Sequence, residues 1–157
     1  MNDPAFVSIA FDDIPCPDFA DVVVVAVPPT EKPVPTDPEV WTKAVFDVRS
    51  LPLWVKSLFA ARQLLVGLIG VEKGDGSVFD VDQVRGGEAL VAEDDRHLDF
   101  RAGVAYDEQR RLLRVTTAVR LKGWRGRLYF LPVGILHDPI TRAMARSAVR
   151  RITREAR

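Results

Sequence analysis

Hydrophobic and polar positions alternate along the chain in patterns that predict an α+β fold. Residues 21–27 read Asp-Val-Val-Val-Val-Ala-Val, a β-branched run that predicts a strand buried on at least part of both faces. Five prolines follow within residues 28–38, and they exclude a helix and a central strand from this segment. We therefore expect an extended loop here.

Two helices are predicted after this loop. Asp37-Pro38 has the signature of a helix start, because aspartate caps free N–H groups and proline suits the first helical position. Apolar residues then recur at helical spacing as far as Val48. A second helix is predicted from Ser50 to about Gly70, where glycine favours a helix end.

Residues 77–133 predict antiparallel strands separated by turns. The expected strands are 78–84, 88–93, 97–106, 112–121 and 127–133. In the third and fourth of these, apolar and polar residues alternate strictly, which indicates one face on a core and one face toward water. These strands should form a curved meander.

The chain then predicts a long amphipathic helix over Asp138–Thr153. Its apolar face includes Met144, and an arginine stripe lies opposite at Arg142, Arg146, Arg150 and Arg154. We expect this stripe to be solvated and partly neutralised by the acidic N-terminal third of the chain.

Charge is unevenly distributed along the chain. Residues 1–50 carry nine acids and three bases, whereas residues 110–157 carry thirteen bases and two acids. Nucleic-acid binding commonly uses aromatic residues among the basic ones, and the last eighteen positions contain no aromatic residue. We therefore favour electrostatic attraction between the acidic and basic parts of the fold over binding of a nucleic acid.

Length and composition limit the class of protein. The 157 residues (17.5 kDa) predict a single domain spanning 1–157. One cysteine excludes an internal disulfide and indicates a reducing compartment. The sequence shows neither a signal peptide nor an apolar run of membrane-spanning length, so we expect a cytoplasmic protein without a membrane partner. Two histidines and one cysteine argue against a structural zinc site, and we predict no metal.

The order strand, two helices, antiparallel strands and a final helix is that of the helix-grip fold, in which a curved sheet wraps around the C-terminal helix. Residues 94–101 (Asp-Asp-Arg-His-Leu-Asp-Phe-Arg), 115–119 and 126–130 resemble an uncharacterised bacterial family of the START-like (SRPBCC) superfamily. That superfamily includes polyketide cyclases and the birch-pollen allergen group, and the resemblance covers about residues 18–151. Similar sequences also occur fused to NAD-dependent epimerase-like domains, which implies an oxidoreductase partner as one role. No Rossmann glycine fingerprint is present, so we predict no bound cofactor.

Acid–base chemistry has one set of candidates. His97, Asp99 and Arg101 alternate along one predicted strand, where a His–Asp pair could act as general base and arginine could hold an anionic substrate. Cross-strand ion pairs on a solvated face explain these charges equally well, and we favour that interpretation. His137, just before the predicted helix, is expected to be a loop residue or an anchor. The enzyme alternative is a cyclase, dehydratase or hydrolase that uses His97, Asp99 or Tyr129.

The preferred hypothesis is an apolar cavity between the sheet and the last helix that binds a small apolar or amphipathic molecule. Aromatic residues should line it from the strands, and Thr117 is the polar member that could orient a ligand. The predicted ligand-binding residues are Trp54, Phe79, Phe100, Thr117, Phe130 and Met144. A second copy of the chain is a further candidate partner. Whether the protein is an enzyme stays open at this point.

Overall fold

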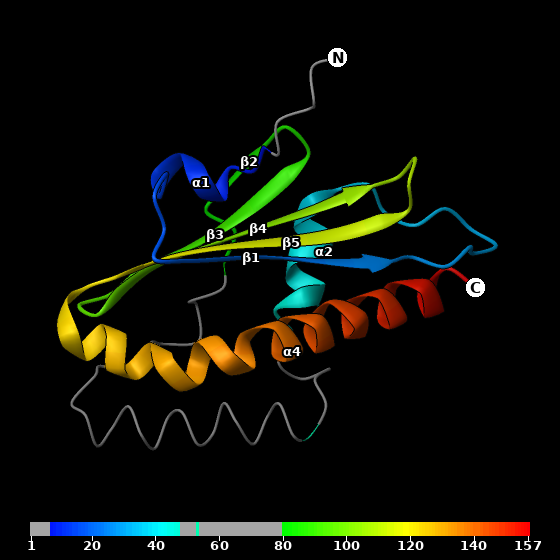
Figure 1. The fold of residues 1–157 in the computed structure, drawn as a ribbon. Coiled ribbons are helices and arrows are strands. Elements are labelled where there is room, and N and C mark those ends of the chain that lie inside the picture. Colours follow the sequence, from blue (N-terminus) through cyan, green and yellow to red (C-terminus); the bar gives the residue numbers. More distant parts are fainter. Residues whose placement is uncertain (1–6, 48–52, 54–79) are drawn as a thin grey trace, which may run out of the picture.

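An antiparallel five-stranded sheet forms the centre of the protein (Figure 1). The computed structural model describes residues 7–47, 53 and 80–157. The strands are β1 (Phe19–Ala26), β2 (Gln83–Arg85), β3 (Glu88–Asp94), β4 (Leu98–Asp107) and β5 (Leu112–Leu121), in the spatial order β1-β5-β4-β3-β2. The helices are α1 (Ala10–Asp13), α2 (Pro38–Val45) and α4 (Gly123–Glu155). This arrangement of a curved sheet against a C-terminal helix confirms the predicted α+β helix-grip class.

The main core lies between one face of the sheet, here called the inner face, and helices α2 and α4 (Figure 1). Alternation along β4 and β5 places Val104, Leu113 and Val115 on the inner face. They pack against Met144 and other apolar residues of α4. Trp41 of α2 is fully buried beneath this face and stacks on the Tyr106 ring, with 4.7 Å between ring centroids. The second half of α4 is therefore sealed onto the sheet.

Local sequence signals at α2 are confirmed. The Asp37 side chain accepts a hydrogen bond from the Glu39 backbone N–H at 2.9 Å, and Pro38 opens the helix. The preceding loop has no regular structure, as its prolines predicted. The second predicted helix, from Ser50 to Gly70, lies outside the described residues apart from Leu53.

The valine run forms β1, but the prediction that it is buried on at least part of both faces is wrong. β1 lies at the edge of the sheet and pairs only with β5 among the described strands. Val23 is buried on the inner face, whereas Val22 and Val24 are about two-fifths exposed on the other side. An edge strand lacks a second neighbour, so little covers its outer face.

The predicted strand over 127–133 is also wrong, because these residues belong to the first half of α4, which begins 15 residues before the predicted start at Asp138. Apolar residues point both toward the sheet, as Phe130 does, and toward solvent, as Leu128 and Leu131 do. A segment that is apolar all round carries no amphipathic period, and aromatic residues then favour a strand by propensity. Gly126 helps to position the helix, because a β-carbon there would collide with the His97 carbonyl oxygen.

The face of the sheet turned away from α4, here called the outer face, is not simply solvated as predicted. The N-terminal segment covers part of it, with Ile9 and Ile14 packed on Leu90 and Ala118. Glu88 is buried under this segment, where its carboxylate accepts hydrogen bonds from the Ser8 hydroxyl (2.8 Å) and the Ile9 backbone N–H (3.0 Å). Contacts between residues so distant in sequence leave no local signal.

The remaining predicted strand, 78–84, corresponds to the short β2 over Gln83–Arg85, while residues 80–82 have no regular structure. No helix in the described part of the chain is long and apolar enough to cross a membrane.

Candidate functional site

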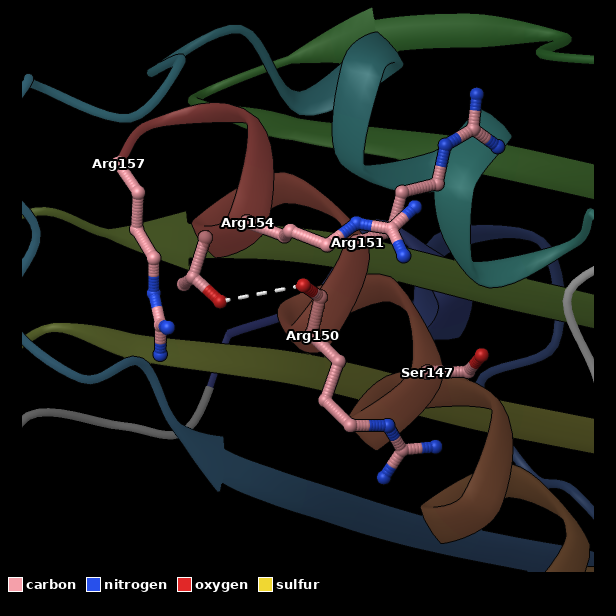
Figure 2. A pocket seen from close by; sticks show the side chains of 6 residues that line it. Ser147, Arg150, Arg151, Arg154 and Arg157 are labelled. Carbon is pink, nitrogen blue, oxygen red and sulfur yellow. Dashed lines mark hydrogen bonds between the residues drawn. The ribbon is translucent and has the colours of Figure 1, made fainter.

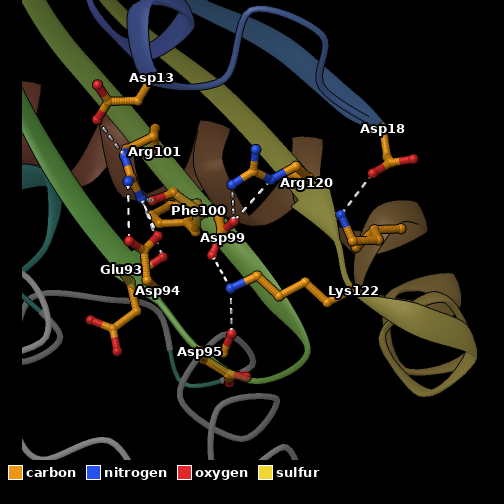
Figure 3. A network of polar contacts seen from close by, with 11 residues as sticks. Asp13, Asp18, Glu93, Asp94, Asp95, Asp99, Phe100, Arg101, Arg120 and Lys122 are labelled. Carbon is orange, nitrogen blue, oxygen red and sulfur yellow. Dashed lines mark hydrogen bonds and ion pairs between the residues drawn. The ribbon is translucent and has the colours of Figure 1, made fainter.

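The charged residues singled out as acid–base candidates lie in a network of ion pairs on the outer face (Figure 3). Asp99 stands opposite Arg120 across the β4–β5 pair, and the Arg120 Nη2 donates to Asp99 Oδ2 at 2.6 Å. Lys122 forms a second ion pair with the same carboxylate. The Asp99 side chain is only 3% exposed, although both cations reach solvent. Asp99 is thus held from two sides.

Arg101 forms a second part of this network. Its guanidinium donates to Asp94 Oδ1 at 2.7 Å and to Asp13 Oδ2 at 3.0 Å, which ties β4 to the N-terminal segment. These carboxylates raise the pKa of Arg101 far above its usual value, against the opposing effect of burial. His97 lies in the turn before β4, where its backbone N–H donates to Asp95 at 2.5 Å. Tyr129, the other acid–base candidate, belongs to α4.

The electrostatics of Asp99 favour its ionised form. Burial by itself raises the pKa of this carboxyl, but hydrogen bonds from Lys122 and Arg120 outweigh burial and hold its pKa below the usual value. A general base needs a pKa near the working pH, so this shift is in the unfavourable direction. The arrangement corresponds to the cross-strand ion pairs that we favoured from the sequence.

The predicted ligand-binding residues lie on the other side of the sheet. Phe100 and Thr117 are on the inner face, Thr117 fully buried and Phe100 partly buried. Phe130 and Met144 reach the same layer from α4. Trp54 and Phe79 lie outside the described residues. The structure thus brings four of the six onto the interface between the sheet and α4.

A partly buried histidine–carboxylate pair lies at this interface, and it was not among the predicted sites. His137 Nδ1 of α4 lies 2.7 Å from Asp21 Oδ2 of β1, and the two side chains are 14% and 18% exposed. The Thr141 hydroxyl lies one helical turn further, 3.4 Å from the same nitrogen. The Phe19 ring packs edge-on against both the His137 ring and the Phe130 ring, at centroid distances of 5.2 and 5.0 Å. One side of the His137 ring is therefore covered by Phe19, which in turn packs on Phe130.

A signal for this pair exists in the sequence once α4 is known to be continuous. Phe130, His137 and Met144 are seven residues apart, which places them on the same side of a helix. Asp21 shares the inner face of β1 with Val23 and was read only as the polar start of the valine run. Because the first half of α4 was predicted as a strand, His137 was expected to lie in a loop.

One oxygen of the pair is left without a partner. Asp21 Oδ1 is buried and accepts no hydrogen bond from any residue of the described structure. Leaving a buried acceptor unpaired costs about 1–3 kcal/mol, so such atoms are uncommon in folded proteins. A bound group with a hydrogen-bond donor would remove this cost. Chemically, this oxygen can accept a hydrogen bond from an N–H or O–H group in an otherwise apolar setting.

The inner-face residues are not equally buried along the interface between the sheet and α4. Around Met144, inner-face residues such as Val104 and Leu113 are completely buried. Toward the first half of α4, the inner-facing Leu98, Phe100 and Phe19 are only partly buried. The loosely covered end is thus the one that carries the Asp21–His137 pair.

Within residues 7–47, 53 and 80–157, no three histidine, cysteine, aspartate or glutamate side chains gather in a way that could hold a metal ion. Comparison with protein families matched residues 14–144 to the family described as "Protein of unknown function (DUF2867)". Comparisons with curated proteins and with solved structures gave no match. The match covers most of the chain and brings no assigned chemistry with it.

Proposed function

Because the chain belongs to the DUF2867 family, whose description assigns no activity, we propose from the site itself that the protein binds a small amphipathic molecule. The binding place is the interface between the inner face of the sheet and the first half of α4. The observation that carries the proposal is the buried Asp21 Oδ1, which has no partner among the described residues and belongs to the carboxylate that contacts His137, whose ring packs against Phe19.

The physical argument combines an apolar wall with one polar anchor. Burial of a ligand's apolar part against Phe19, Phe100 and Phe130 contributes roughly 25 cal/mol per Å² of apolar surface removed from water. A donor on the ligand would satisfy Asp21 Oδ1 and fix the ligand's orientation, and hydrogen bonds to a charged acceptor contribute about 1.5–3 kcal/mol. Ligand sites in proteins commonly have this composition, largely apolar with few polar groups.

Two further points support the proposal. The helix-grip arrangement places a curved sheet around a helix, and the resemblance to START-like proteins implies a ligand cavity in that location. The inner-face residues that are incompletely buried lie at the same end as the polar pair. The sequence-based expectations about cofactor, nucleic acid, membrane, compartment, a second copy and an oxidoreductase partner stay predictions.

The proposal is tested with a neutral amphipathic probe that carries one N–H donor, N-phenyl-1-naphthylamine. We expect a saturable increase in its fluorescence on titration with the wild-type protein. Asp21→Leu should weaken this binding about tenfold, the equivalent of one hydrogen bond to a charged acceptor. The matched control is Asp82→Leu, which changes an exposed carboxylate outside the interface and should leave the probe's affinity unchanged.

Circular dichroism checks that both variants fold. Probe binding that does not saturate, or that is equally strong in Asp21→Leu, would refute the site. Native mass spectrometry of the purified wild-type protein then tests for a co-purified small molecule, which the Asp21→Leu protein should retain less well.

A further inference from the structure

An open hollow lies at the C-terminal end of α4 (Figure 2). Its volume is about 550 Å³, and the last two turns of the helix line it. The lining residues are Ser147, Arg150, Arg151, Thr153, Arg154 and Arg157. The hydroxyl of Thr153 donates to the Val149 carbonyl at 2.7 Å and is therefore occupied. Guanidinium groups are the main polar groups left to meet a ligand.

The arginines of this hollow differ from most others in the protein. On the strands, Arg101, Arg114 and Arg120 each pair with a carboxylate. In the hollow, Arg151 pairs with Asp47 at 2.5 Å and with Glu155 at 3.4 Å. For the other three, Arg150, Arg154 and Arg157, no carboxylate of the described residues lies within ion-pair distance. The acidic N-terminal third thus neutralises Arg151 and leaves the exposed stripe residues Arg150 and Arg154 uncompensated.

The helix end by itself does not balance this charge. Residues 146–157 contain five arginines and one glutamate, which gives a charge of +4 from these side chains. The carbonyl end of a helix is equivalent to roughly −0.5 of a charge, and its attraction for a cation is worth only about 0.3–1 kcal/mol. Arginine keeps its charge at every physiological pH, so these exposed guanidinium groups are available to an external anion. A hollow lined by one sign of charge also concentrates the field that attracts such an ion.

We propose that this hollow binds the phosphate or diphosphate group of a small molecule. Arg150 and Arg154 are four residues apart, which puts them on one side of α4, and Arg157 follows the end of the helix and lines the same hollow. The two helical positions lie about 6 Å apart along the axis, so their long side chains can reach a single group of this size. The planar guanidinium group can donate two parallel hydrogen bonds to phosphate oxygens. An arginine therefore suits this anion better than a lysine, whose ammonium group acts as a point charge.

The hollow favours a compact ligand over a nucleic-acid strand. Its volume falls within the roughly 300–1,000 Å³ typical of small-molecule sites. None of its lining residues is aromatic, whereas single-stranded nucleic acid is bound by aromatic rings that stack on the bases. The three uncompensated arginines lie within two helical turns and do not trace a path along the surface.

Inorganic pyrophosphate is the probe that tests this site, titrated into the full chain by calorimetry at low salt. We expect saturable binding that weakens as sodium chloride is raised. The double variant Arg150→Gln/Arg154→Gln should lower the affinity about tenfold or more. The control Arg146→Gln removes an equally exposed arginine of the same helix that does not line the hollow, and it should change the affinity less than about twofold.

Vesicles of phosphatidylcholine with and without phosphatidic acid distinguish the source of the phosphate. Binding only to the acidic vesicles, in competition with pyrophosphate, would identify a lipid headgroup, and pyrophosphate binding without vesicle binding would identify a soluble phosphate compound. Absence of saturable pyrophosphate binding would overturn the proposal, as would an equal loss in Arg146→Gln. Binding of duplex DNA that is tighter than pyrophosphate and steeply salt-dependent would replace it with a nucleic-acid site.

Discussion

Replacing Arg120 and Lys122 together with alanine would leave the Asp99 carboxylate buried without its two cations. The carboxylate is 3% exposed, whereas the side chains of Arg120 and Lys122 are 56% and 41% exposed. The cations can therefore be removed with little loss of packing, while the anion keeps its place on β4. Breaking a buried pair in this way typically costs about 3–5 kcal/mol. We expect a loss in the lower part of this range, because the turn before β4 can shift to admit water.

The pH dependence of the variant's stability provides a sharper test than the size of its destabilisation at one pH. In the wild type the pKa of Asp99 is lowered, because the hydrogen bonds from Lys122 and Arg120 outweigh the raising effect of burial. Its contribution to stability is thus fully present above the unfolded carboxyl pKa of about 3.9 and is lost as the pH falls through the lower folded value. Without the cations, burial raises this pKa, and the hydrogen bond with Asp94, the weakest of the lowering influences, is the one that remains against it. The folded variant then binds a proton more tightly than the unfolded chain, so its stability should increase as the pH falls from 7 toward 5.

The assay is urea unfolding at pH 7 and pH 5, followed by tryptophan fluorescence, to which the buried Trp41 contributes. The triple variant Asp99→Asn/Arg120→Ala/Lys122→Ala is the control, because it has lost the same cations but carries no buried charge. Relative to this control, the double variant should gain stability on going from pH 7 to pH 5, because its folded state takes up a proton on Asp99 in this range more readily than the unfolded chain does. Identical pH dependence in the two variants would refute the claim that Asp99 is a buried charge held by its partners.

Three further changes test the fold. Gly126→Ala should destabilise the protein by about 1–3 kcal/mol although alanine favours a helix, because the new β-carbon meets the His97 carbonyl oxygen; a higher thermal midpoint would contradict the close approach of α4. Trp41→Phe should lower the free energy of unfolding, measured in urea, by about 1 kcal/mol more than the lost apolar area accounts for, because the indole N–H donates to the Pro35 carbonyl at 2.8 Å. Asp37→Ala should cost about 1 kcal/mol by removing the α2 cap, and an unchanged unfolding midpoint would show that the cap is dispensable.

Features that depend on neighbouring residues were predictable from the sequence alone. The start of α2 follows from Asp37-Pro38, because capping and the fixed φ of proline act within one turn. The strict alternation of residues 98–121 predicted β4 and β5 and the two faces of the sheet, and the register confirms that Asp99 and Phe100 lie on opposite faces. The class of fold follows from the order of such elements, each of which is set locally.

Other features were decided only by tertiary packing. Residues 127–133 are apolar and aromatic enough for a strand, and they are helical in the structure, where Phe130 packs on Phe19 of β1. The candidate site depends on the same packing, because His137 and Asp21 are 116 residues apart and meet only when α4 lies across the inner face. Each of them alone resembles an ordinary polar residue, a loop histidine and the first residue of a valine run. Their proximity, burial and unpartnered oxygen are properties of the packed interface, which no local pattern of residues encodes.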